Sequence, residues 1–114
     1  MTTPSEDQTI DAVFGALVDA TRRDIVRRAM AGDEGVSELA AHYSMSFAAV
    51  QKHVAVLERA GLVTKHQVGR RKVVRTRMAG LRQAQDLLDQ LEELWRGRLN
   101  RMADIIGEME ENPT

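Results

Sequence analysis

Three consecutive polar side chains, Gln51, Lys52 and His53, are well suited to hydrogen bonding with an external partner. An amide both donates and accepts, an ammonium donates, and an imidazole does either according to its tautomer. They stand beside the small residues Ala48 and Ala49, which would let another surface come close to the backbone. This combination suits a partner that displays hydrogen-bonding edges.

A single amphipathic helix would carry these groups. Ser46 can cap its start and Gly61 can stop it. Val50, Val54 and Leu57 recur at i, i+4 and i+7, which predicts one buried face. Such a helix can enter the major groove of DNA, which admits one helix and displays base edges. An ordinary core helix shows the same pattern, so this stretch alone leaves both interpretations open.

The charge of the chain is concentrated around this helix. Residues 46–82 carry nine Lys and Arg against one acid, a balance of +8. Residues 1–45 carry −4 and residues 83–114 carry −5, so the net charge is only −1. A basic centre between acidic ends is typical of a surface that binds a polyanion. Chance clustering on a solvated surface is the alternative.

The composition argues against several classes of protein. With 43% hydrophobic and 29% charged residues in 114, we expect one globular domain. The absence of cysteine excludes disulfides, thiolate metal sites and cysteine nucleophiles. No apolar run is long enough for a membrane span, and the polar, acidic N-terminus is unlike a secretion signal, so we expect a cytoplasmic protein. No catalytic or metal-ligand constellation can be assembled, so we expect no enzyme and no cofactor.

The elements before the basic helix are predicted to be short helices. Residues 8–31 should form the first two, because Ser5 and Gln8 match a capping box and Asp19 can cap the second helix. Ser37 would cap a third, and a turn of three or four residues would lead into the Ser46 helix. Residues 36–61 thus form a predicted helix-turn-helix.

A β-hairpin is predicted over residues 62–78, where β-branched residues flank the turn Gly69-Arg70-Arg71. A hairpin directly after a helix-turn-helix is the wing of a winged helix. Its tip would carry Arg70, Arg71 and Lys72, placed to contact phosphates or a minor groove. A charged tip that serves only solubility is the alternative.

Residues 80–111 predict one long helix with an apolar stripe. A helix of about thirty residues extends roughly 45 Å, more than a core of this size covers. The stripe therefore needs a partner, and the same helix of a second subunit is the economical one. Folding back over its own core is the alternative. The predicted interface residues on this helix are Leu81, Leu88, Leu91, Trp95, Met102 and Ile105.

The chain resembles the ArsR/SmtB family of bacterial winged-helix regulators over about residues 8–100. The likeness is carried by LVDATRR at 17–23, by VSELA at 36–40 and above all by VQKHVAVLERAGLV at 50–63, which resembles the family's recognition-helix signature. The resemblance implies a mainly α fold with a small β-hairpin. It also implies a homodimer in which the first and last helices pack across a two-fold axis, so Phe14 joins the expected interface.

The resemblance also implies which residues contact double-stranded DNA. Gln51 could pair with adenine and Lys52 could reach guanine or a phosphate. His53 could contact phosphate or serve as a packing residue, and Phe47 could touch a thymine methyl or brace the helix start. The full expected set is Ser46, Phe47, Ala48, Gln51, Lys52, His53, Arg70, Arg71 and Lys72.

The metal-sensing branch of the family places a cysteine pair where this chain has Gly35 and Ser37. Residues 81–114 contain no histidine, which the family's other metal site would need. We therefore expect no metal site. An unknown small-molecule effector is compatible with the family, and Met30, Trp95 and Met102 could hold an apolar one, although such residues also form plain core.

The sequence therefore predicts a homodimeric transcriptional repressor that binds an inverted-repeat operator, with recognition helix 46–60 in the major groove and wing 69–72 on the backbone or minor groove. The alternative is a protein-binding winged-helix dimerisation module without sequence-specific DNA binding. The +8 centre argues against that alternative, because a module that binds only proteins has no need of it.

Overall fold

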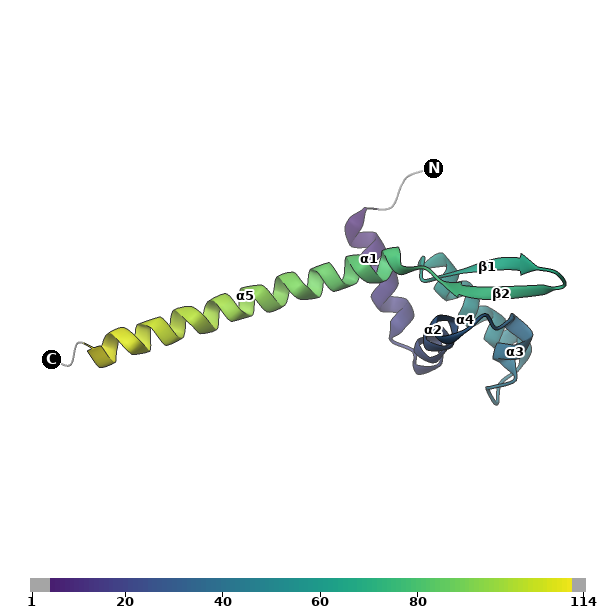
Figure 1. Ribbon diagram of the computed structural model, residues 1–114, viewed down its shortest axis with the longest axis horizontal. Helices are drawn as coiled ribbons and strands as arrows, with labels where there is room; N and C mark the ends of the chain where they lie inside the picture. Colours follow the sequence, from purple (N-terminus) through teal and green to yellow (C-terminus); the bar gives the residue numbers. More distant parts are fainter. Residues whose placement is uncertain (1–4, 112–114) are drawn as a thin grey trace. The chain divides into compact units, whose positions relative to one another are not determined.

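The computed structural model describes residues 5–111 as a mainly helical chain with one hairpin (Figure 1). It divides into a unit that ends at Ala84 and a second unit that begins at Gln85. Within residues 5–111, no helix is both long enough and apolar enough to cross a membrane. The elements are α1 (Glu6–Leu17), α2 (Ala20–Ala31), α3 (Val36–Ala40), α4 (Phe47–Arg59), β1 (Val63–Val68), β2 (Arg71–Thr76) and α5 (Met78–Glu111).

Local side-chain contacts begin the first two helices where the sequence predicts. Ser5 Oγ accepts from the Gln8 backbone N–H at 3.2 Å, and the Gln8 side chain accepts from the Ser5 N–H at 3.0 Å. Asp19 Oδ1 accepts from the Arg22 N–H at 3.0 Å. Each contact satisfies a donor that has no partner inside its own helix, so the capping predictions are confirmed.

The third helix begins differently from the prediction. Its N-cap is Gly35, and Ser37 lies inside the helix instead of capping it. The Glu38 carboxylate takes over the capping role, because it accepts from the Gly35 N–H at 3.3 Å. The connection to α4 runs from Ala41 to Ser46, longer than the expected three or four residues.

The hairpin runs from Val63 to Thr76 instead of the predicted 62–78, and its turn is Gly69-Arg70, because Arg71 already pairs within β2. β1 and β2 pair antiparallel, from Val63 opposite Thr76 to Val68 opposite Arg71. The Arg77 N–H donates to the Leu62 carbonyl at 2.8 Å and closes the base of the hairpin. The run of β-branched residues has ended there, and α5 begins at Met78, with the helix formers Met and Ala.

The core of the first unit is built around α4, with α1, α2, α3 and the hairpin against it. The first turn of α5 joins this core through Gly80, where an added Cβ would lie 3.0 Å from Val13 Cγ2. A side chain at that position would push against a fully buried valine. The largest fully buried side chains are Ile25, Leu39, Leu57, Leu62, Val13, Val50, Val54, Val63, Val73 and Val74.

Candidate nucleic-acid interface

Helix α4 is held at both ends and along one face. Ser46 Oγ accepts from the Ala49 N–H at 3.1 Å. Gly61 stops the helix in the left-handed region at φ 76°, which glycine adopts without steric cost. The predicted apolar face of Val50, Val54 and Leu57 is completely buried. The rotation of α4 about its axis is therefore fixed, and its opposite face points outward.

The outward face carries most of the predicted recognition residues of α4. Gln51 and Lys52 are exposed within its first turns. Phe47 keeps 46% of its surface exposed, although it is a large aromatic residue. Ser46 and Ala48 are exposed beside it. The start of α4 thus presents an amide, an ammonium and a hydroxyl over small side chains.

His53 differs from its neighbours because it is half-buried. Its Nδ1 lies 3.3 Å from Nη1 of Arg22, so the guanidinium donates and the imidazole accepts. The sequence left open whether His53 contacts phosphate or packs against neighbours, and the structure places it against a neighbour. The Arg22 backbone N–H also lowers the pKa of Asp19 below its ordinary value. Arg22 was missed by the sequence analysis, because its partners lie on other helices.

A second unpredicted network fixes the connection before α4. The Tyr43 hydroxyl donates to Asp24 Oδ2 at 2.6 Å, and Arg28 Nε donates to the same oxygen at 2.8 Å. Burial and this carboxylate raise the pKa of Tyr43 to about 12. The hydrogen bonds from Tyr43 and Arg28 lower the pKa of Asp24. The network ties the connection between α3 and α4 to α2.

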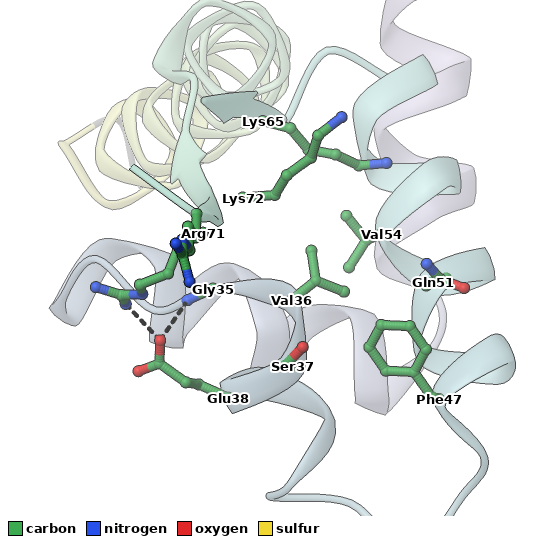
Figure 2. A pocket seen from close by; sticks show the side chains of 11 residues that line it. Gly35, Val36, Ser37, Glu38, Phe47, Gln51, Val54, Lys65, Arg71 and Lys72 are labelled. Carbon is green, nitrogen blue, oxygen red and sulfur yellow. Dashed lines mark hydrogen bonds and ion pairs between the residues drawn. The ribbon is translucent and has the colours of Figure 1, made fainter. Parts of the chain in front are cut away.

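A groove with a volume of about 450 Å³ lies between the wing, α3 and the start of α4. Figure 2 shows Lys65 and Lys72 on the wing side, Phe47 and Gln51 on the α4 side, and Glu38 on α3. We call this the wing groove. It is lined by Gly35, Val36, Ser37, Glu38, Phe47, Gln51, Val54, Lys65, Arg70, Arg71 and Lys72.

The wing groove brings together residues that the sequence proposed separately. Gln51 and Phe47 come from α4, while Arg70, Arg71 and Lys72 come from the hairpin. Lys65 was not among the predicted contacts. It follows Val63 by two positions on β1, so strand alternation places both on one face and could have identified it.

Arg71 is not a free cation at the tip. It forms an ion pair with Glu38 of α3 and donates to the Asp33 carbonyl at 2.8 Å. Arg75 lies 3.4 Å from Asp33 Oδ1. Arg70 and Lys72 are exposed on either side of Arg71. The three neighbouring cations of the wing are therefore not equivalent.

The histidines lie apart from one another in the described structure. His42 pairs with Glu34 at 2.8 Å, and His66 pairs with the Thr64 hydroxyl at 2.8 Å. Across residues 5–111, no group of three or more His, Cys, Asp or Glu side chains is placed to hold a metal ion.

The predicted interface residues differ in exposure. Leu81 is half-buried and packs against the core of the first unit. Phe14 is 37% exposed. Within the second unit, no described residue is buried in the single chain. Large exposed apolar residues follow one another along this part of α5: Leu88, Leu91, Leu94, Trp95, Leu99, Met102, Ile105, Ile106 and Met109.

Comparison with known proteins agrees with this architecture. Residues 19–65 match the model of the arsR family of bacterial regulatory proteins. The chain is 36% identical over 96 residues to the HTH-type transcriptional regulator Rv2034 of Mycobacterium tuberculosis, covering 84% of this chain and 87% of that protein. It is 32% identical over 57 residues to the transcriptional repressor SdpR of Bacillus subtilis, covering 50% of this chain and 63% of that one.

A solved structure agrees over a similar length. The ArsR-like transcriptional regulator from Rhodococcus sp. RHA1 superposes with a TM-score of 0.74 at 32% identity, covering 85% of this chain and 92% of the other. This chain accordingly belongs to the ArsR family of bacterial regulatory proteins and is a DNA-binding transcriptional regulator.

Proposed function

We propose that two copies of this chain form a transcriptional repressor that binds an inverted-repeat operator. In each copy, α4 enters the major groove and the wing follows the backbone or the minor groove. A two-fold dimer would space the half-sites by roughly 34–36 Å, one turn of DNA. The similarity to SdpR, which is named a repressor, supports repression.

The observation that carries this proposal is the arrangement of charge around α4. Lys65, Arg70 and Lys72 line the wing groove opposite the exposed amide of Gln51. Cations that contact phosphates supply affinity, while an amide on a helix in the major groove can read bases. The groove therefore offers cations for the DNA phosphates and an amide for a base. A regulator of specific sites needs both.

The second copy is proposed from the apolar surface of α5. Leu91, Trp95 and Ile105 each keep more than half of their surface exposed in the single chain. Contiguous exposed apolar residues of this size mark an interaction surface. Their spacing along one helix favours an identical helix as the partner.

In this proposal residues 1–114 act as one winged helix-turn-helix domain, and residues 80–111 form its dimerisation helix. The dimer works in the cytoplasm, where bacterial DNA lies.

A mobility-shift titration tests the proposal. The probes are DNA fragments recovered by selection from random sequence, with shuffled fragments as controls. We expect a selected fragment with two-fold symmetry, bound as one dimer, with an affinity that falls steeply as salt rises. Equal affinity for selected and shuffled DNA would contradict operator recognition. Selected sites without two-fold symmetry would contradict the dimer arrangement.

A further inference from the structure

We infer that Glu38 competes with DNA phosphate for the guanidinium of Arg71 on the wing. When DNA binds, a phosphate displaces the Glu38 carboxylate from Arg71. Arg71 would then change partners between the free and the bound protein. The inference rests on the proposed function, because it concerns how tightly the wing groove holds DNA. It assigns a role to an acidic residue that neither reads bases nor contacts phosphate.

The contact itself joins two elements across the wing groove. The Arg71 guanidinium on β2 pairs with Oε1 of Glu38 on α3, as the dashed line in Figure 2 shows. The same carboxylate oxygen accepts from the Gly35 N–H at 3.3 Å. Glu38 is therefore aimed at the cation by a backbone bond and is not a freely moving surface acid.

Glu38 places a negative charge in a groove that is otherwise positively charged. Among the described residues that line it, Glu38 is the one acidic side chain, beside Lys65, Arg70, Arg71 and Lys72. A phosphate that approaches the wing meets the negative charge of Glu38 and finds Arg71 already neutralised. Like charges at short range oppose the approach. The pair therefore lowers the affinity of the groove for any nucleic acid.

The ion pair can open at small cost. Both side chains are about half exposed, at 50% for Arg71 and 52% for Glu38, and ion pairs with such exposure contribute little net stability. When Arg71 leaves, Glu38 keeps its bond to the Gly35 N–H, and the Asp33 carbonyl, which also accepts from Arg71, belongs to an exposed residue where water can replace the lost donor. No buried charge is stranded, so a phosphate can take Arg71 without a large penalty.

The wing does not depend on the ion pair for its attachment. The Val74 N–H donates to the Glu34 carbonyl at 3.1 Å, and Gly35 pairs with Val73 as an isolated antiparallel bridge. These backbone contacts hold β2 against the segment before α3. A purely mechanical role for the ion pair would duplicate them, whereas competition for Arg71 would not.

The test uses the full-length protein, a selected DNA fragment and a shuffled one. We expect Glu38→Gln to raise the affinity for both fragments about two- to fivefold at low salt, as an exposed pair of this kind allows. The slope of log affinity against log salt should stay about the same, because Arg71 neutralises a phosphate in both complexes. A slope steeper by about one would mean that Arg71 stays on Glu38 in the unsubstituted complex, which would contradict the displacement. Glu34→Gln is the matched control. It removes one acid of the same segment, one that pairs with His42 and does not line the groove, and it should change affinity by less than half as much.

A double-mutant cycle identifies the partner. In an Arg71→Ala background, the gain from Glu38→Gln should fall to about half or less, because only the repulsion between Glu38 and phosphate remains. If the full gain persists there, Glu38 acts by repulsion alone and the inference is wrong. If Glu38→Gln weakens binding while thermal unfolding is unchanged, the pair instead positions the wing, and the inference is also wrong. Glu38→Ala, measured in parallel, checks that the new amide adds no contact of its own.

Failure of the unsubstituted protein to show salt-dependent binding would overturn the proposed function itself, and this inference with it.

Discussion

The Nη1 atom of Arg22 lies 3.3 Å from Nδ1 of His53 and connects the start of α2 to the recognition helix. The same guanidinium donates to the carbonyls of Ala16 at 2.7 Å and Gly15 at 3.4 Å. Those carbonyls stand at the C-terminal end of α1, where a helix leaves its last acceptors without partners. One side chain therefore joins three helices and orients one of the predicted DNA-contact residues.

Replacement of Arg22 should destabilise the fold more than replacement of its neighbour. We expect Arg22→Ala to lower the free energy of unfolding by about 1–3 kcal/mol, because carbonyls and an imidazole lose a charged donor. Arg23→Ala is the control, since the exposed Arg23 side chain donates to a single carbonyl among the described residues, that of Leu17 at 2.8 Å. Urea denaturation measures both variants, and equal losses would show that the link to His53 contributes nothing.

Gly80 should not tolerate a side chain, although it lies in a helix. We expect Gly80→Ala to lower the free energy of unfolding by about 1–2 kcal/mol, since the new methyl group would sit 3.0 Å from buried Val13. Gly15→Ala is the control in an equally helical position with nothing within 4 Å, and it should raise stability by about 0.5–1 kcal/mol. Thermal unfolding compares the two. A stabilising Gly80→Ala would mean that α5 does not pack this closely on α1.

The two sides of the wing groove should contribute differently to DNA binding. Gln51→Ala should cost about 1–3 kcal/mol on the selected fragment and little on shuffled DNA, because a lost base contact removes discrimination. Arg70→Ala should weaken binding to both fragments alike and reduce the salt slope by about one. Arg70 suits this test better than Arg71, whose charge is already paired. Titration by fluorescence anisotropy measures both effects, and parallel losses of specificity would contradict this division.

Tyr43 should make the fold sensitive to alkaline pH. Burial and Asp24 raise the pKa of its hydroxyl to about 12, above the value of about 10 in an unfolded chain. The folded state therefore keeps its proton longer, and the contribution is complete below pH 10 and disappears as pH rises towards 12. We expect the unfolding free energy of the unsubstituted protein to fall across this range more steeply than that of Tyr43→Phe. Tyr43 is the only tyrosine, so tyrosinate absorbance follows it directly. Equal slopes would rule out the raised pKa.

The dimer should depend on the apolar face of α5 and not on its polar face. We expect Leu91→Glu to raise the dimer dissociation constant by about thirtyfold or more, as a charge at the centre of an apolar interface does. Asn100→Asp is the control, because it adds a negative charge nine residues further along, on the opposite side of the helix, and should have little effect. Light scattering after gel filtration measures the mass. Emission of Trp95, the only tryptophan, should shift to shorter wavelength as the dimer forms. A monomer in the unsubstituted protein at all concentrations would overturn the proposed dimer.

The starts of three helices were predictable because their signals are local. Ser5, Asp19 and Ser46 each bond a backbone N–H three residues further along, so spacing alone identifies them. The buried stripe of α4 was predictable because helical periodicity reflects which face is buried. The hairpin was predictable because β-branched residues flank a turn that begins with glycine. For the helix that starts at Val36, the sequence predicted Ser37 as the cap. The Glu38 carboxylate makes the capping contact instead.

The chain's own sequence thus determined the elements, their order and the concentration of positive charge. Only the tertiary structure decided which of those charges are free. Arg71 and Glu38 are 33 residues apart, and Arg22 and His53 are 31 apart. No local pattern encodes such pairs, because they form only when packing of the apolar core brings separate elements together.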